Sequence, residues 1–489
     1  MAASRLLNRR QWSNSIFSVA QRNPSEMDLI GQIHDNLSQR VLLPFSRLQR
    51  SSRTATRPTQ QAFNEGIRFR REAASWNNEQ RISWIIKRLR SVVRRAYDET
   101  VYYRELFDRN NFDPHAEFGF DDFARLPVLT RDDINEAGST LLASSVPKDQ
   151  LRKDSTGGST GVPTILWLGP VERGWRDSGM ERFFEILGVP EGSRTALLWG
   201  HHLDPKAADS LRERYQAFVS NTRWFDSLRL SPKTLDEYHE ELERFRPASI
   251  IAYASALGQL AEHVIARGYK PNYPTRCLIT GAEKLWSRHR RLIEQAFGRP
   301  VHERYGSRDA GCLGVQLNPA HTLDYTIDWA NTLVEPELPE PESPILVTKL
   351  QADAMPMIRY RIGDVARFPE GSKPGHPTFV LPELTGRDVD RIWLPNDGWV
   401  TGLEIPHLLK DYPVREFLFL QRKDHSVELQ IVPQSGFDEN SVRSIQDILA
   451  ANLPGLQIKI ELKESVVRTK SNKWRPVISE VNEGSRALA

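Results

Sequence analysis

The chain has 489 residues, of which 39% are hydrophobic and 26% are charged. This composition is typical of a globular protein, and the length predicts more than one domain because a single core stops growing beyond roughly 250–300 residues. The formal net charge of +3 is too small to indicate that the chain as a whole binds nucleic acid. No apolar run approaches the roughly 20 residues that cross a bilayer, so we predict no transmembrane segment.

Cysteine is rare in this sequence. Cys277 and Cys312 are too few for a disulfide framework or a zinc-ligand cluster. A reducing compartment is the simplest interpretation, and no secretory signal pattern is present near the start. We therefore predict a cytoplasmic location.

The first part of the chain, residues 1–62, is basic and rich in serine. Four arginines precede the first acidic residue, Glu26. A mitochondrial presequence has this composition, but a basic extension that is poorly ordered or partly helical is the simpler interpretation. Residues 51–62 are polar, small and without periodicity, which predicts a linker.

The chain then alternates between helical and strand patterns. Residues 78–107 have apolar side chains at helical spacing with Arg and Lys on the other face, and Thr130 is a plausible helix N-cap before two aspartates. Between 163 and 350 the alternation predicts a largely parallel sheet covered by helices. The predicted strands are 164–168, 195–200, 249–253, 276–280 and 344–350, and the predicted helices are 230–245 and 286–298.

The pattern changes near Gly386-Arg387, where we place a domain boundary. Beyond it, EFLFLQRKDHSVELQIVP predicts a hairpin, 438–453 a capped amphipathic helix and 456–465 a further strand. We therefore expect a large domain over 63–386 and a small α+β domain over 387–489.

A glycine-rich segment, STGGSTGVPT (155–164), has two chemical interpretations. It contains G-x-S-x-G, but a nucleophile elbow needs a strand before the serine and a helix directly after it, whereas Val162-Pro163 and a strand pattern follow here. It also lacks the Gly-Lys-Ser/Thr of a Walker A loop. Glycines let successive backbone N–H groups converge on an anion, and Thr156, Ser159 and Thr160 add hydroxyl donors, so the loop suits phosphate. An ordinary surface turn is the alternative.

Three further motifs follow in order: GAEKL (281–285) with YGSRDAG (305–311), RYRIGDVARF (359–368) and RTKSNKWRPVIS (468–479). Together with the glycine-rich loop they resemble the adenylate-forming superfamily of acyl-CoA ligases and adenylation domains. The branch they resemble is that of the phenylacetate–CoA ligases and their capsular-polysaccharide (CapK-type) relatives. The resemblance extends over about residues 80–480. It implies an α/β fold of multi-domain α+β type, with a large N-terminal domain of helix-covered sheets and a small mobile C-terminal domain.

The resemblance also implies a nucleotide site. Tyr305, with Gly306 behind it, would pack on the adenine, and Asp364 would hold the ribose hydroxyls, although Tyr305 also fits a core aromatic. Asp309 stands where the family has a Mg²⁺-binding glutamate, and Arg308 where it has a hydroxyl. The loop for the ATP phosphates comprises Thr156, Gly157, Gly158, Ser159, Thr160 and Gly161, and the adenine-lining stretch comprises Gly281, Ala282 and Glu283.

Two basic residues receive catalytic roles from the same resemblance. Lys473 matches the lysine of the mobile domain, with Asn472 in place of the usual glycine, and Lys470 is a nearby competitor. Arg387 matches an arginine that reaches nucleotide oxygens, although it could instead pair with Asp364. A positioned ammonium would stabilise the charge that accumulates around phosphorus.

The implied enzyme is an AMP-forming acid–thiol ligase. A small carboxylic acid would attack the α-phosphorus of ATP with Mg²⁺ present, and the acyl adenylate would then pass to coenzyme A. One alternative is transfer of the adenylyl or acyl group to a different acceptor in polysaccharide or secondary-metabolite biosynthesis, and another is a degenerate scaffold. The acyl pocket would lie near Trp199–His202, Tyr253–Ser255 and Gly281, where aromatic and histidine side chains indicate a flat or polar-ringed acid, although a core Trp and a surface His pair explain them as well.

Overall fold

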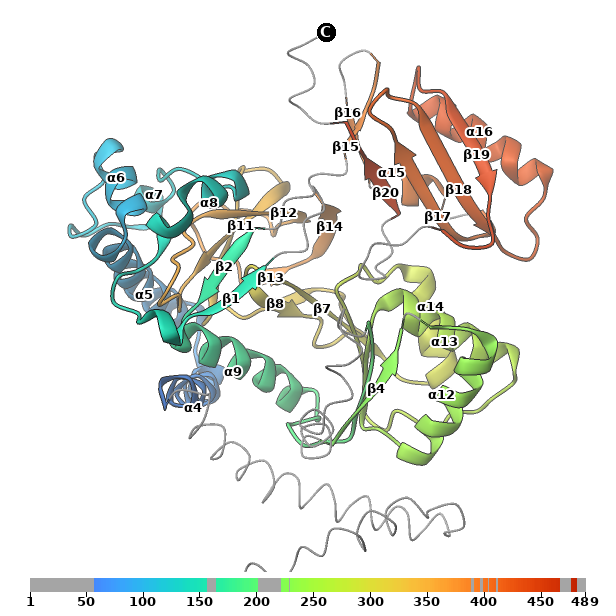
Figure 1. The fold of residues 1–489 in the computed structure, drawn as a ribbon, viewed down its shortest axis with the longest axis horizontal. Helices are drawn as coiled ribbons and strands as arrows, with labels where there is room; N and C mark the ends of the chain where they lie inside the picture. Colours follow the sequence, from blue (N-terminus) through green and yellow to red (C-terminus); the bar gives the residue numbers. More distant parts are fainter. Residues whose placement is uncertain are drawn as a thin grey trace, which may run out of the picture.

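The computed structural model describes most of the chain but not all of it (Figure 1). The predicted basic extension as far as residue 56, the glycine-rich loop at 156–163, His201 and His202, and Lys473 lie outside the described residues. Those residues are 57–155, 164–200, 221–227, 229–387, 391–395, 399–402, 404–409, 412–466 and 476–481.

Helices form the first part of the described chain. The predicted helix over 78–107 is confirmed but divides at Thr100, whose side chain accepts a hydrogen bond from Tyr103 N and so begins a second helix. Thr130 is confirmed as an N-cap, since it forms a reciprocal capping box with Asp133. The helices are α4 (Arg57–Glu72), α5 (Asn78–Glu99), α6 (Val101–Arg109), α7 (Phe120–Phe123) and α8 (Arg131–Ala137), with short 3-10 turns η2 (Ala73–Ser75), η3 (Gly138–Leu141) and η4 (Lys148–Gln150).

The linker prediction is wrong from residue 57 onwards, because α4 begins there. The physical reason is tertiary packing against α9 (Pro170–Ile186), which lies beside α4 (Figure 1). A β-carbon on Gly66 would lie 2.2 Å from Ser178 Oγ, and one on Gly174 would lie 2.4 Å from Thr59 O. The two helices therefore approach so closely that only glycine fits at these two positions.

A buried ion pair fastens α4 to the rest of the domain. Arg70 Nε and Nη2 donate to the two carboxylate oxygens of Asp328 at 3.0 and 2.8 Å, and Arg70 Nη1 donates to Ser178 Oγ at 2.9 Å. The guanidinium carbon of Arg70 also lies 5.1 Å from the ring centroid of Trp175. The guanidinium thus donates to both carboxylate oxygens of Asp328, which offsets the free-energy cost of burying the two charges.

The largest sheet has eight strands in the order β13-β9-β8-β7-β6-β5-β3-β4. The strands from β4 to β7 are parallel, whereas β8, β9 and β13 are antiparallel. Their bounds are β3 (Thr195–Trp199), β4 (Thr222–Asp226), β5 (Ser249–Ala252), β6 (Cys277–Gly281), β7 (Val301–Ser307), β8 (Gly311–Val315), β9 (Tyr325–Ile327) and β13 (Val380–Leu381).

The prediction of a largely parallel sheet is therefore correct for only part of the domain. The predicted strand over 344–350 belongs to a second, antiparallel sheet of order β10-β11-β12-β14. No helix lies between these strands along the chain, although β13 of the first sheet comes between β12 and β14, and antiparallel pairing needs no crossover helix. They are β10 (Thr332–Pro336), β11 (Glu342–Lys349), β12 (Tyr360–Arg367) and β14 (Glu383–Arg387), and a separate arm is made of β1 (Arg152–Ser155) and β2 (Ile165–Leu168).

The predicted helices over 230–245 and 286–298 are confirmed as α12 (Pro232–Phe245) and α14 (Ser287–Phe297), and Gly298 ends the second with φ +60°. An additional helix, α13 (Ala254–Ala266), lies between them in the chain. One apolar cluster joins this helical layer to the parallel strands and includes Leu198, Leu257 and Ile293.

The C-terminal unit has the predicted hairpin, helix and strand. Its sheet has the order β19-β18-β17-β20, and Arg288 of α14 donates hydrogen bonds to the carbonyls of Val414 and Arg415 at 2.6 and 3.0 Å. The elements are β15 (Arg391–Trp393), β16 (Trp399–Thr401), α15 (Glu404–Leu409), β17 (Val414–Gln421), β18 (Val427–Pro433), α16 (Glu439–Asn452), β19 (Ile458–Leu462) and β20 (Val477–Ser479).

Among the described residues, no helix is both long and apolar enough to cross a membrane.

Replacing Arg70 by methionine is expected to lower stability strongly, because Asp328 would keep a buried charge without its partner. Breaking a buried ion pair costs about 3–5 kcal/mol. Arg71→Met is the matched control: Arg71 pairs with Glu185 but its side chain is 58% exposed, and such pairs contribute about 0–1 kcal/mol. Thermal melting followed by circular dichroism compares the two variants, and equal melting temperatures would contradict the role assigned to Arg70.

Candidate active site

Three predicted nucleotide residues meet where strands β7, β12 and β14 come together. Tyr305 Oη donates a hydrogen bond to Asp364 Oδ2 at 2.9 Å, and both side chains are buried. Asp364 lies directly opposite Arg387 in the antiparallel register of β12 and β14. The ring of Tyr305 also belongs to the main apolar core, so its core position and its polar contact occur together. The side chain of Arg387 is not described.

The predicted adenine-lining stretch follows the end of β6. Ala282 has φ +66°, the left-handed region, which turns the chain sharply after the strand. Glu283 Oε2 accepts a hydrogen bond from Ser255 N at 2.9 Å, at the start of α13. The carboxylate therefore joins the loop after β6 to the loop after β5. Both loops lie at the carboxyl-terminal ends of parallel strands, where open α/β folds bind ligands.

Gly306 is required by the close approach of β8. The register of β7 and β8 shifts between Tyr305 and Gly306, and a β-carbon on Gly306 would lie 2.3 Å from Gly311 O. Because no side chain fits there, this bulge sets the position of Tyr305 relative to the turn that follows β7.

Asp309, the predicted metal ligand, lies at the start of that turn and is 3% exposed. Its Oδ2 atom accepts a hydrogen bond from Tyr360 Oη at 2.6 Å and lies 3.5 Å from Arg131 Nη2. Among the described residues, its Oδ1 atom accepts no hydrogen bond, and no group of three His, Cys, Asp or Glu side chains forms a metal site. Mg²⁺ bound with a nucleotide commonly takes one or two carboxylates plus phosphates and water, so Oδ1 fits a single-carboxylate contact.

Arg308 connects this turn to the start of the glycine-rich loop. Its Nη1 atom donates to Ser155 O at 2.9 Å, while Arg176 Nη2 of α9 donates to the Arg308 carbonyl at 2.9 Å. Ser155 is the last residue of β1, and β1 pairs antiparallel with β2. The strand β2 thus follows the glycine-rich segment in the chain. A nucleophile elbow would need a helix at that place, so this agrees with the argument against a serine hydrolase.

Sequence reasoning missed Glu303, which contacts the stretch that was predicted to line the adenine. Its Oε1 atom accepts a hydrogen bond from Leu285 N at 2.8 Å, and burial raises the pKa of the Glu303 carboxyl. Tyr325 also hydrogen-bonds to this carboxyl. The alternation of side chains along β7 could have indicated Glu303, because Glu303 and Tyr305 lie two residues apart and so share a face of the strand.

A buried charge network between α9 and β11 was also missed. Lys349 Nζ lies 3.0 Å from Glu172 Oε1, and both side chains are almost fully buried. Burial lowers the pKa of Lys349, and the neighbouring Glu172 opposes that effect. Asp353 accepts hydrogen bonds from Val171 N and Glu172 N and so caps α9. These contacts hold α9, and with it Arg176, against β11.

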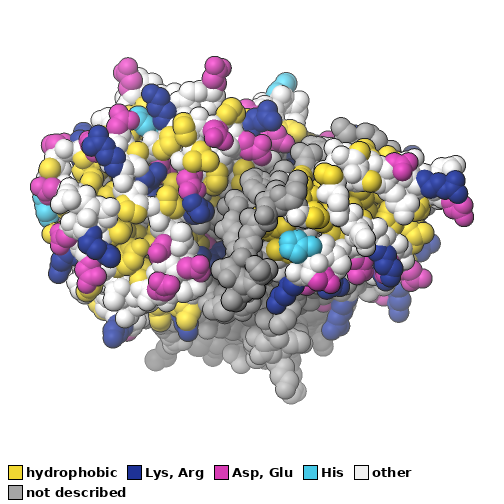
Figure 2. Space-filling view, turned by 90° about the horizontal axis from the view of Figure 1, so that it is seen from above, with side chains coloured by type: hydrophobic (Ala, Val, Ile, Leu, Met, Phe, Trp, Pro, Cys, Tyr) yellow, Lys and Arg dark blue, Asp and Glu magenta, His cyan; other side chains and the backbone are white. Residues whose placement is uncertain are grey.

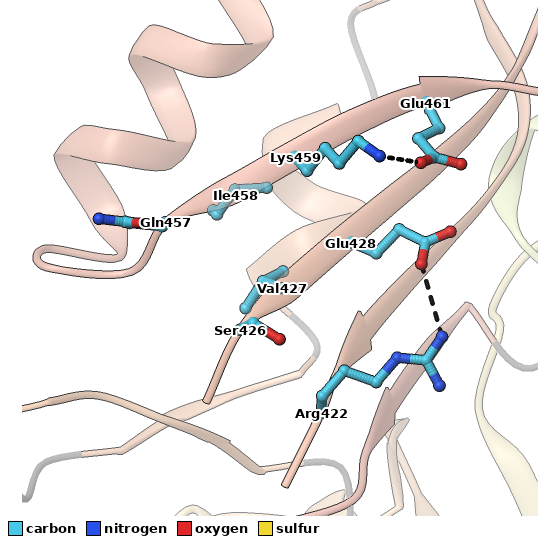
Figure 3. Close-up of a pocket in the computed structure, with 8 residues that line it drawn as sticks. All are labelled: Arg422, Ser426, Val427, Glu428, Gln457, Ile458, Lys459 and Glu461. Carbon is cyan, nitrogen blue, oxygen red and sulfur yellow. Dashed lines mark hydrogen bonds and ion pairs between the residues drawn. The ribbon is translucent and has the colours of Figure 1, made fainter. Parts of the chain in front are cut away.

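A separate hollow of about 480 Å³ lies on the small unit, over the paired strands β18 and β19 (Figure 3). Its charged side chains pair with one another: Lys459 Nζ lies 2.6 Å from Glu461 Oε1, and Arg422 Nη2 lies 3.5 Å from Glu428 Oε2. None of the predicted site residues lines it. On the face of the molecule in Figure 2, basic and acidic side chains are likewise interspersed.

Comparison with known proteins agrees with this geometry, although no family model matches the chain. Protein CapK of Staphylococcus aureus is 22% identical over 352 residues, which cover 70% of this chain and 76% of that protein. A phenylacetate–coenzyme A ligase of Pseudomonas putida is 23% identical over 320 residues, covering 63% and 70%. A solved 2-hydroxyisobutyryl-CoA ligase in its postadenylation state shares the fold, with a TM-score of 0.64, 20% identity and coverage of 85% of this chain and 92% of that one.

The chain is therefore similar in sequence to protein CapK and to a phenylacetate–coenzyme A ligase, and similar in fold to a 2-hydroxyisobutyryl-CoA ligase. The predicted fold class is confirmed, since this fold combines a large N-terminal unit of helix-covered sheets with a small C-terminal unit. The boundary predicted at Gly386-Arg387 falls within β14, which pairs with β12 of the large unit as far as Arg387.

Replacing Glu303 by glutamine is expected to change how stability depends on pH. Because burial raises the pKa of Glu303, the protonated carboxyl stabilises the fold at acid pH, and this contribution is lost as pH rises through the raised pKa. Glutamine stays neutral, so wild type should lose stability relative to Glu303→Gln as pH rises above about 4, the ordinary pKa of a glutamate carboxyl. Melting temperatures measured as pH rises test this, with the exposed Glu340→Gln as control, and a constant difference would contradict it.

Proposed function

We propose that this chain is an ATP-dependent ligase that activates a carboxylic acid as an acyl adenylate and then transfers the acyl group to coenzyme A. The observation that carries the proposal is the meeting of Tyr305, Asp364 and Arg387 beside the Gly281–Glu283 loop. The likeness to phenylacetate–CoA ligases and to a 2-hydroxyisobutyryl-CoA ligase supports the same reaction.

The nucleoside half of ATP would bind at this meeting point. An aromatic ring provides a flat apolar surface for a purine, and a carboxylate accepts two hydroxyl donors of a ribose. The hydrogen bond from Tyr305 to Asp364 fixes the carboxylate relative to the ring. Arg387 would add a guanidinium for nucleotide oxygens from the opposite strand.

The triphosphate would extend toward the arm of β1 and β2. Arg308 already joins the Asp309 turn to Ser155, directly before the glycine-rich loop that we propose for the phosphates. Asp309 would hold Mg²⁺ through Oδ1, and the ion would neutralise phosphate charge when bound. Lys473 would place an ammonium near the α-phosphate, where charge develops during attack by the acid.

The second half-reaction needs a thiol to reach the adenylate. We propose residues 387–489 as a small domain that turns about the segment after Arg387 and withdraws Lys473. Such a movement would break the hydrogen bonds from Arg288 to the carbonyls of Val414 and Arg415. Closure before transfer would keep water away from the adenylate.

A second candidate keeps the adenylate and changes the acceptor. The likeness to protein CapK favours it, because that relative is not named as a coenzyme A ligase. Release of AMP that depends on coenzyme A would support thioester formation, whereas adenylate formation without such release would support another acceptor.

Lys473→Ala is expected to slow acid-dependent ATP–pyrophosphate exchange by roughly 10²–10³-fold, the effect of removing one electrostatic contact to a developing charge. ATP affinity measured by calorimetry should stay nearly unchanged, because the contact forms in the transition state. Lys470→Ala is the matched control from the same segment. Exchange in Lys473→Ala as fast as in that control would reject the assignment.

Asp309→Asn is expected to raise the Mg²⁺ concentration for half-maximal exchange by roughly tenfold or more, since a neutral amide is a poorer ligand than a carboxylate. Titration of exchange rate with Mg²⁺ measures this, and thermal melting reports any loss of the contacts to Tyr360 and Arg131. Asp324→Asn serves as the control. A melting change with an unaltered Mg²⁺ requirement would assign Asp309 a structural role instead.

A further inference from the structure

Arg304 lies on β7 between two residues already placed in the site, but its side chain faces the other way. Successive side chains of a strand point to opposite faces, so Arg304 is on the face away from Glu303 and Tyr305. On the neighbouring strand β6 its partner in register is Gly281. A β-carbon on Gly281 would lie 3.3 Å from Arg304 Nε and 3.4 Å from Arg304 Nη2. The missing side chain of Gly281 therefore gives the guanidinium room to cross β6.

The guanidinium reaches an aromatic pair at the ends of β3 and β5. The guanidinium carbon of Arg304 lies 5.9 Å from the ring centroid of Trp199. The rings of Trp199 and Tyr253 lie 4.1 Å apart between centroids, with an interplanar angle of 32°. Burial is the largest cause of the raised pKa of Tyr253. The charge of Glu283 raises this pKa further and the charge of Arg308 lowers it, so Tyr253 lies near these two residues of the candidate site.

Within the part of the chain that the structure describes, the side chain of Arg304 has no ion pair and no hydrogen bond. The other arginines of this region differ, because Arg176 donates to the Arg308 carbonyl and Arg308 donates to Ser155 O. Arg304 is half-buried, so its charge is partly removed from water without a compensating anion. A guanidinium has five N–H donors in a planar fork, which suits a carboxylate.

We infer that Arg304 binds a second carboxylate of the acid substrate, so that the enzyme activates a dicarboxylic acid whose spacer is flat and apolar. The inference rests on the proposed function. The first carboxylate would react beside the proposed nucleotide, beyond the carboxyl-terminal ends of β5 and β6. The second would meet Arg304 across Gly281, with the spacer against Trp199 and Tyr253. Phenylacetate and 2-hydroxyisobutyrate, the acids named for the relatives, each carry one carboxylate, so this chain departs from them.

The test compares matched acids in ATP–pyrophosphate exchange with the full-length protein. The probes are phenylacetate and 4-carboxyphenylacetate, which differ by one carboxylate, and 4-sulfophenylacetate, which replaces the planar anion by a tetrahedral one. Wild type should give the highest kcat/KM with 4-carboxyphenylacetate. Arg304→Met should lower that kcat/KM by roughly 10- to 150-fold, the range for a hydrogen bond to a charged group.

Two further variants separate charge recognition from a folding defect. Arg304→Lys keeps the charge but loses the fork, and should retain part of the preference for the diacid. Arg299→Met, an exposed arginine in the turn before β7, should keep all of it. Thermal melting of each variant reports whether it is folded.

The outcomes also distinguish this inference from the proposed function. Exchange with phenylacetate as efficient as with 4-carboxyphenylacetate, in wild type and Arg304→Met alike, would overturn the inference while supporting adenylate formation. A preference for the sulfonate over the carboxylate would overturn the dicarboxylate assignment. No exchange with any of the acids would overturn both proposals.

Discussion

The candidate site depends on the pleat of one strand. Between Glu303 and Gly306, β7 sends alternate side chains to opposite faces of the sheet and then comes so close to β8 that only glycine fits. One face holds Tyr305 against Asp364, and the other directs Arg304 across β6. A shift of β7 by one residue would exchange the two faces. The same backbone register therefore sets the positions of the residues proposed for the nucleotide and for the acid.

Buried acidic and basic side chains keep that register and its surroundings in place. Glu303 receives the backbone N–H of Leu285, Asp309 receives the hydroxyl of Tyr360, and Glu172 pairs with Lys349. Each carboxylate joins segments that are distant in sequence, and each would be costly to bury without its donor. Specific polar contacts, more than apolar packing alone, therefore fix how the sheets and helices meet around the site.

Much of the fold could be predicted because its central strands are buried on both faces. Strands such as β5 and β6 are continuous apolar runs between turn residues, which is a strong local signal. Helix α13 was missed because it is apolar on most of its surface, and α9 because it is only weakly amphipathic and contains Gly174 and Gly179. Helix α4 was taken for a linker because packing on α9, a tertiary effect, determines it.

The motifs identified Tyr305, Asp364 and Gly281, but not the residues beside them. Glu303 and Arg304 have no special neighbours in the sequence, and their importance comes from the face each occupies and from the segments that meet there. Local patterns indicate which residues suit a kind of chemistry. They do not indicate which other side chains the folded chain brings within reach, and Trp199 is more than a hundred residues from Arg304.

The small unit exposes a backbone edge, which has a consequence for how the protein behaves among its neighbours. In the part of the chain that the structure describes, β19 is the last strand of its sheet, so one row of its N–H and C=O groups has no partner strand. Open edges of this kind recruit strands from other molecules. Here Lys459, Glu461 and Lys463 form a chain of ion pairs along the edge, with N–O distances of 2.6 and 2.7 Å. A strand that tried to add there would have to displace or desolvate these charges, so the edge itself opposes aggregation.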